Sequence, residues 1–229
     1  MRNFFQAVFA VLLLLTFPAL SSAQARIEPS KLSGSDGASS AHYRYVFENP
    51  RFTTPVQEVE FDGAGQGKFR FKRKDSDEIV NQLTVSATVL AQIQASLDEL
   101  NFLSSQEKYQ HKKDFSHLGT MTITFARNGK GRTISFNYTD NPGLNRLSDI
   151  FRNLVTQETR IFEMETVLAN DPISMPAQLR LLESELKSRR IADPQRFVPM
   201  LKNLKLDESV PLIARNHAER LLQAIRKGK

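Results

Sequence analysis

Apolar and polar side chains alternate strictly in two short stretches of the chain, EVEFD at residues 58–62 and KFRFK at residues 68–72. A period of two is typical of a β-strand that has one buried face and one solvated face. The two stretches therefore predict a β-hairpin. Between them, GAGQG at residues 63–67 supplies the glycines that a tight five-residue turn needs.

The charges of these two stretches predict how the hairpin pairs. The polar residues of the first strand are all acidic, and those of the second are all basic. If position numbers that add to 130 face each other, the apolar residues meet on one side and opposite charges meet on the other, where each pair adds a small stabilisation. The expected pairs are Phe61 with Phe69, Val59 with Phe71, Asp62 with Lys68, Glu60 with Arg70 and Glu58 with Lys72. The glycines do not indicate a phosphate loop, because they lead into a strand and not into a helix.

A second hairpin is predicted over residues 120–139, TMTITFARNGKGRTISFNYT. Its apolar residues again share one face, and its other face carries uncharged Thr, Ser and Asn side chains. Either Asn128-Gly129 or Gly129-Lys130 would form a two-residue turn that keeps the apolar faces matched. The stretch HYRYVF, residues 42–47, is a candidate fifth strand.

Two amphipathic helices separate and follow the hairpins. SATVLAQIQASLDELNF, residues 86–102, places its large apolar side chains on one helical face and has Ser86 as a good N-cap. After the second hairpin, Asn141-Pro142 is typical of a helix start, and the apolar stripe runs on to Asp171-Pro172. The order predicts an antiparallel sheet with helices packed on its apolar face, an α+β fold.

From Asp171 onward the pattern is helical only. Leu179, Leu182 and Leu186 share one face, Asp193-Pro194 starts a second helix, and Asp207 or Ser209 is the expected cap of the last one. The predicted organisation of the whole chain is a signal peptide at 1–25, a flexible leader at 26–41, an α+β domain at 42–170 and a small all-helical region at 171–229.

Residues 193–225 resemble one HEAT-type helical pair. The shared features are the Asp193-Pro194 start, Val198-Pro199, the spacing of Leu201 and Leu204, Asp207, Val210-Pro211 and Ala214-Arg215. The upstream region resembles exported bacterial domains that carry no assigned activity, because it has the same order of strand, glycine turn, strand, helix ending in Asn101-Phe102, and hairpin. These resemblances imply a fold and no reaction.

The first 25 residues are typical of a secretory signal peptide. Arg2 precedes an apolar run from Phe4 to Phe17, and small residues offer cleavage after Ala23 or Ala25. That run is shorter than the roughly 20 residues needed to span a bilayer. The chain has no cysteine, which excludes a lipoprotein anchor and a disulfide framework. We therefore expect a periplasmic or secreted bacterial protein, with no transmembrane segment in the mature chain.

The formal net charge of +6 is unevenly distributed. Residues 26–170 hold 18 basic and 18 acidic side chains, whereas residues 171–229 hold 12 basic and 7 acidic ones. The C-terminal region is therefore where weak contact with an anionic surface is expected. Several of its cations end helices, where they complement the helix dipole without any partner. Export argues against a nucleic-acid role.

Chemistry-bearing residues are few. HKKDFSH places His111, Asp114 and His117 close together, and all three are residue types that bind zinc. Their spacing matches no known zinc motif, and no nucleophile motif, cofactor motif or catalytic residue is identified. We favour a non-catalytic module that binds a protein or peptide. The alternatives are a hydrolase, metal-assisted through those three residues, and an envelope protein that docks on polyanions.

Overall fold

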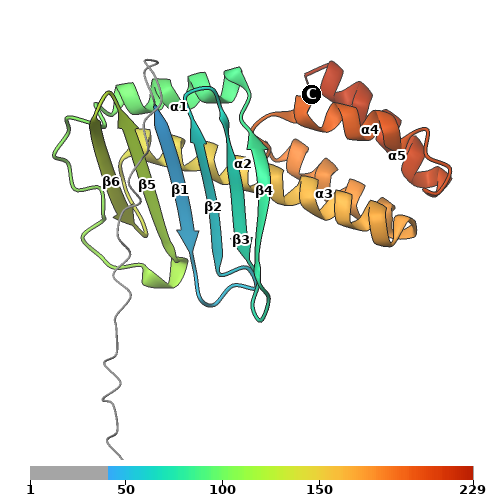
Figure 1. The fold of residues 1–229 in the computed structure, drawn as a ribbon, viewed down its shortest axis with the longest axis horizontal. Coiled ribbons are helices and arrows are strands. Elements are labelled where there is room, and N and C mark those ends of the chain that lie inside the picture. Colours follow the sequence, from blue (N-terminus) through green and yellow to red (C-terminus); the bar gives the residue numbers. More distant parts are fainter. Residues whose placement is uncertain (1–40, 229) are drawn as a thin grey trace, which may run out of the picture. The chain divides into compact units, whose positions relative to one another are not determined.

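The computed structural model describes residues 41–228, which contain a six-stranded antiparallel sheet and five α-helices (Figure 1). The predicted signal peptide, and the predicted leader except its last residue, lie outside this range. The strand order is β4-β3-β2-β1-β5-β6. The strands are β1 (His42–Glu48), β2 (Val56–Asp62), β3 (Gln66–Lys72), β4 (Glu78–Thr84), β5 (Thr120–Arg127) and β6 (Lys130–Phe136).

The α+β prediction is confirmed, but the sheet has six strands and not four or five. The candidate fifth strand, β1, lies in the middle of the sheet between β2 and β5. The missed strand is β4, at one edge. Its alternation is imperfect, because Asn81 shares a face with Ile79 and Leu83 while Val80 is exposed on the other. An edge strand tolerates such a pattern, since it is only partly covered.

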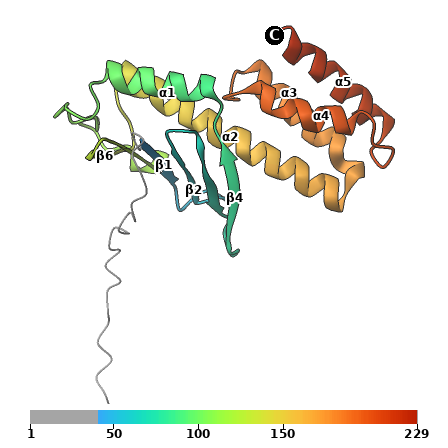
Figure 2. The same ribbon diagram turned by 45° about the horizontal axis from the view of Figure 1, so that its top comes forward.

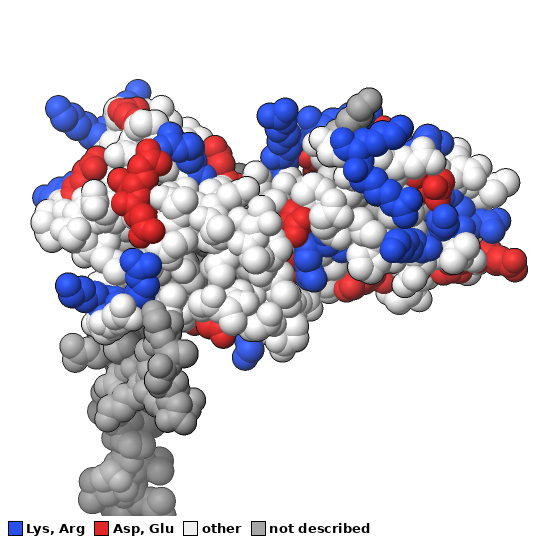
Figure 3. All heavy atoms as spheres, turned by 90° about the horizontal axis from the view of Figure 1, so that it is seen from above, with Lys and Arg blue, Asp and Glu red and all other residues white. Residues whose placement is uncertain are grey.

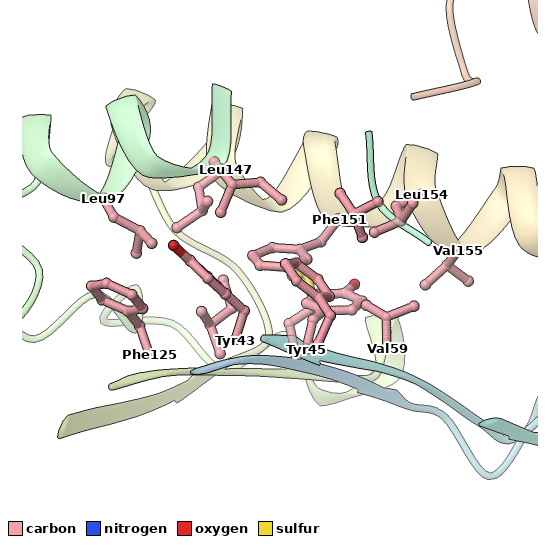
Figure 4. Close-up of a cluster of buried hydrophobic side chains, with 14 of the residues drawn as sticks. Tyr43, Tyr45, Val59, Leu97, Phe125, Leu147, Phe151, Leu154 and Val155 are labelled. Atoms are coloured by element: carbon pink, nitrogen blue, oxygen red, sulfur yellow. The ribbon is translucent and has the colours of Figure 1, made fainter. Parts of the chain in front are cut away.

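Helices α1 (Ala87–Glu99) and α2 (Pro142–Asn170) cover the apolar face of the sheet (Figure 2). Aromatic side chains dominate the core between these layers. Tyr45 stacks on Phe151 of α2 with ring centroids 5.2 Å apart (Figure 4). Tyr43 stacks on both Phe61 and Phe125, with ring centroids 5.0 Å apart in each pair. The sheet therefore packs broad rings against the apolar stripes that the sequence predicts for the two helices.

Local signals set the ends of these helices as expected. The Ser86 hydroxyl accepts from the Val89 amide at the start of α1, and the Asn141 side chain does the same for Leu144 at the start of α2. At the end of α1, Asn101 takes a left-handed conformation with φ 46°, and the Phe102 amide donates to the Leu97 carbonyl. This is the bonding of a Schellman motif, which directs the chain back toward the sheet.

The first hairpin forms, but its predicted register is wrong by two residues. Paired positions add to 128, so Val59 faces Phe69 and Phe61 faces Gly67. The turn is only three residues long, because Asp62 accepts hydrogen bonds from the amides of Ala64 and Gln66 and so closes the loop early. Asp62 is therefore a turn residue and not the partner of Lys68.

The outer face of the hairpin carries an ion-pair network, although not the predicted one-to-one ladder. Arg70 bonds Glu58 at 2.6 Å and, diagonally, Glu60 at 2.7 Å. Central strand β1 adds Arg44, which pairs with Glu58, and His42, which pairs with Glu60. Of the basic run, Arg70 is paired within the sheet, and Arg73 pairs with Glu163 of α2. Within the described residues Lys68 and Lys72 form no ion pair, so only the Glu60–Arg70 rung of the predicted ladder is present.

The second hairpin turns at Asn128-Gly129, with Arg127 facing Lys130. Both turn residues have positive φ, 53° and 74°, which is the geometry of a type I′ turn. On its outer face the hydroxyls of Thr122 and Ser135, and those of Thr124 and Thr133, hydrogen-bond across the strands at 2.9 Å. The structure thereby decides between the two turns that the sequence leaves open.

The C-terminal helices surround a second hydrophobic cluster of mostly aliphatic side chains. Residue bounds are α3 (Met175–Lys187), α4 (Val198–Leu204) and α5 (Leu212–Arg226). The last part of α2 joins this cluster through Met164, so one 29-residue helix contributes to both cores. Asp193 caps the turn before α4 as predicted. The predicted cap of the last helix is wrong, because α5 starts after Pro211 and the Asp207 side chain bonds Ser209 in the preceding turn.

Candidate functional site

A groove with a volume of about 310 Å³ lies between the sheet, the middle of α2 and the end of α3. Most of the surface that it exposes is apolar, although six of its ten lining residues are polar or charged. The residues that line it are Tyr45, Phe47, Phe52, Gln57, Arg152, Val155, Thr156, Thr159, Arg160 and Glu185. Its size is at the lower end of the roughly 300–1,000 Å³ found for small-molecule pockets. It therefore suits one ring or one large apolar side chain.

Strand β1 and the loop after it build one wall of the groove. Phe47 ends the inner face of β1, and its ring lies 5.7 Å from that of Phe52 in the loop. Buried Asn49 fixes this loop: its side-chain oxygen accepts from the Arg51 amide, and its amide nitrogen donates to the His117 carbonyl. Phe52 is 49% exposed, so the wall presents an aromatic ring to solvent.

Helix α2 provides the opposite wall. Arg152, Val155, Thr156 and Thr159 follow the i, i+3, i+4, i+7 spacing that places side chains on one helical face. Val155 is buried against the sheet core, whereas Arg152 is exposed and pairs with Asp149 one turn earlier. This face carries the groove away from the aromatic core toward the C-terminal helices.

A buried ion pair closes the far end of the groove. Arg160 of α2 bonds both carboxylate oxygens of Glu185 on α3, at 2.8 and 2.9 Å, and also bonds the Gln178 side chain. Both charged side chains are almost completely buried. A bidentate arginine–carboxylate pair is geometrically rigid, so it fixes α3 against α2 and holds the wall in place.

Two hydroxyls of the groove residues lack a hydrogen-bond partner within residues 41–228. These are the Tyr45 hydroxyl and the Thr159 hydroxyl, two of five such buried side-chain atoms in this range. An unsatisfied buried polar group costs about 1–3 kcal/mol, and such groups are rare in native structures. Burial also raises the pKa of Tyr45 well above its usual range, so this hydroxyl keeps its proton and remains a donor.

His111, Asp114 and His117, the candidate zinc ligands, do not form a common cluster. His111 Nε2 lies 3.2 Å from a carboxylate oxygen of Asp140, and its Nδ1 accepts from the Lys113 amide. Asp114 accepts from the Asn137 side chain, and His117 lies in a short turn before β5. Within the described part of the chain, no group of three His, Cys, Asp or Glu side chains is arranged to hold a metal ion. The segment instead packs His111 and Phe115 against Tyr138.

His217 of α5 is a buried residue in the apolar stripe of that helix. Its Nε2 lies 3.0 Å from a carboxylate oxygen of Glu183 on α3. That carboxylate also pairs with Lys187. His217 therefore has a structural contact and is not part of the groove.

Basic side chains are dense over the C-terminal helices, and acidic ones lie among them (Figure 3). This matches the net charge of residues 171–229. Lys205 pairs with Glu219, and Lys187 pairs with Glu183. The described helices offer no segment long and apolar enough to cross a membrane.

Sequence comparison adds no relative. No protein-family model matches the chain, and no curated protein is significantly similar to it.

The sequence patterns did not predict the groove. Phe47 at the end of a strand, Phe52 in a loop and the mixed polar and apolar face of α2 are each visible in the sequence. That they line one groove is decided by the tertiary structure.

Proposed function

We propose that the chain is an exported, non-catalytic module that binds an apolar segment of a protein or peptide in the groove. The observation that carries the proposal is the groove itself: an aromatic-walled cavity of about 310 Å³ that opens to solvent beside a half-exposed phenylalanine, Phe52. A pocket of this size takes one anchoring side chain, and anchoring side chains in pockets contribute most of the affinity of many interfaces.

The backbone on two sides of the groove is held in place before any partner arrives. Asn49 fixes the loop that carries Phe52, and the Arg160–Glu185 pair fixes the far end. A preformed site loses little conformational entropy when it binds. The fixed loop and the fixed ion pair therefore favour tight binding of a partner in the groove.

The charged groups of the groove also favour binding over catalysis. General acid–base chemistry needs a titratable group that is free to exchange a proton with a substrate. Arg160 and Glu185 are bonded to each other, and Arg152 is bonded to Asp149. The proposal that the protein is exported depends on the sequence of residues 1–25. A secondary proposal, weak contact of residues 171–229 with anionic surfaces, depends on their net positive charge.

The test is to select peptides from a random-sequence display library on the intact chain and to measure their affinity for a blocked groove. Thr156→Arg places a long side chain in the groove, and Arg is a good helix former. Thr166→Arg is the matched control, because Thr166 is an exposed threonine of the same helix outside the groove.

We expect Thr156→Arg to weaken the selected peptides at least about tenfold, equivalent to 1.4 kcal/mol, and Thr166→Arg to leave them unchanged. Equal affinity for both variants would show that the groove is not the binding site. Circular dichroism of each variant confirms that the fold is retained.

A further inference from the structure

Two hydroxyl groups in the wall of the proposed binding groove need hydrogen-bond partners, and an entirely apolar occupant would not supply them. The Tyr45 hydroxyl and the Thr159 hydroxyl are both buried and have no partner in the described chain. Tyr45 is 1% exposed. Both residues line the groove, one from the sheet and one from the helix.

Thr159 differs in this respect from its neighbours on α2. The hydroxyl of Thr156 donates to the Arg152 carbonyl at 2.9 Å, and that of Ser148 donates to the Leu144 carbonyl at 2.7 Å. This bond to the preceding turn is the usual way for a helical hydroxyl to be satisfied. Thr159 forms no such bond, so its oxygen retains its capacity to bond a group in the groove.

The charges around the groove do not call for an ionic ligand. Arg160 uses three of its nitrogens in bonds to Glu185 and Gln178, and Arg152 pairs with Asp149. The pair of Arg160 and Glu185 is neutral as a unit. A carboxylate or an amine in the groove would lose its hydration without gaining a free counter-charge.

Resting on the proposed function, we infer that the anchor of the bound segment is a neutral hydroxylated ring, the side chain of a tyrosine, whose hydroxyl bonds Tyr45 and Thr159. A ring fits the volume and packs on Phe47 and Phe52. A phenol hydroxyl both donates and accepts, as do the two hydroxyls that face it. The lining side chains shift slightly to admit it, because neither oxygen is open to solvent in the free structure.

The inference is tested with p-cresol and toluene, which reproduce the tyrosine and phenylalanine side chains and differ by one hydroxyl. Binding to the full chain is followed by NMR, through the methyl resonances of Val155 and Thr156. Tyr45→Phe and Thr159→Val remove the two hydroxyls and keep the shape of each side chain. Tyr138→Phe is the matched control, since Tyr138 is exposed and lies outside the groove.

We expect the unmodified chain to bind p-cresol about tenfold more tightly than toluene, which corresponds to 1.4 kcal/mol. The preference disappears in Tyr45→Phe, shrinks in Thr159→Val and is unchanged in Tyr138→Phe. Equal binding of the two probes by the unmodified chain, or a preference that survives in the Tyr45→Phe, Thr159→Val double variant, overturns the tyrosine anchor and leaves the apolar groove standing. If neither probe shifts the groove resonances at millimolar concentration, both the anchor and the proposed groove fail.

Discussion

The two hydrophobic cores of this chain are built from different side chains. The core under the sheet contains stacked rings such as Tyr43, Tyr45, Phe61 and Phe151, whereas the core of the C-terminal helices has Phe197 as its one aromatic member within the described range. A flat sheet offers a broad surface that rings cover well. Helices meet by interdigitating ridges, for which leucine is well shaped.

Helix α2 contributes side chains to both cores and therefore couples their stability. Its first half carries Phe151 into the aromatic core, and Met164 enters the aliphatic one. Between these points, Gln157 accepts from the Asp193 amide, and Arg160 bonds Glu185. The candidate groove lies along this shared stretch, so a partner bound there contacts the elements that join the two cores.

Removing a ring from the aromatic core gives the largest expected effect. Phe151→Ala should lower the free energy of unfolding by about 4 kcal/mol, because it leaves a cavity beneath Tyr45. Urea unfolding is followed by tyrosine fluorescence, which reports only on the α+β part because all four tyrosines precede residue 139, and by far-UV circular dichroism. We expect both signals to shift together, since α2 is continuous.

Leu179→Ala in the aliphatic core is the matched test of that coupling. Leu179 is fully buried and far along the chain from every tyrosine. If this variant moves the circular dichroism transition but leaves the tyrosine transition in place, the cores unfold independently and the coupling through α2 is wrong.

Breaking the ion pair between α2 and α3 should have the next largest effect. Arg160→Leu leaves Glu185 buried without its counter-charge and should cost roughly 3 kcal/mol. The double variant Arg160→Leu, Glu185→Leu should recover most of this loss, because a buried pair is often replaceable by apolar side chains of similar size. A double variant that stays as unstable as the single one would show that the pair itself contributes net stability.

The smallest effect is a pH-dependent one at the junction of the cores. Burial raises the pKa of Glu158, which accepts from Gln157 and lies near Arg196 and Glu165. A raised folded-state pKa contributes stability at low pH that is lost as the pH rises through that value. Glu158→Gln should therefore be more stable than the unmodified chain at pH 7, and this advantage should vanish as the pH falls toward the ordinary glutamate pKa.

Glu60 on the outer sheet face provides the opposite sign. Partial burial opposes its ionisation, but hydrogen bonds from Arg70 and His42 outweigh burial and lower its pKa. Its stabilising contribution is therefore present at pH 7 and is lost as the pH falls through the lowered value. Glu60→Gln should be less stable than the unmodified chain at pH 7. If both variants are more stable, or both less stable, than the unmodified chain at pH 7, the proposed difference between Glu158 at the junction and Glu60 on the surface is wrong.

Much of the fold follows from local patterns along the chain. Ser86 and Asn141 cap helices because their side chains reach the first free amides, and Asn128-Gly129 turns because both residues tolerate positive φ. These effects act within four or five residues. The groove could not be predicted in this way, because Phe52 and Glu185 come to line one groove only after the sheet, α2 and α3 have packed together.

By itself the sequence determined the alternation that makes the hairpins, the apolar stripes of α1 and α2, and the helical character of everything after Asp171. Tertiary structure decided the place of β4, and it added to the local Asp62 bonds a contact that holds the first turn. Gly65, at φ 76°, lies so close to the Val85 carbonyl that any side chain would collide with it, and the Val85 amide bonds the Gly65 carbonyl at 2.8 Å. The turn therefore packs against a segment twenty residues away, and no local pattern of charges contains that contact.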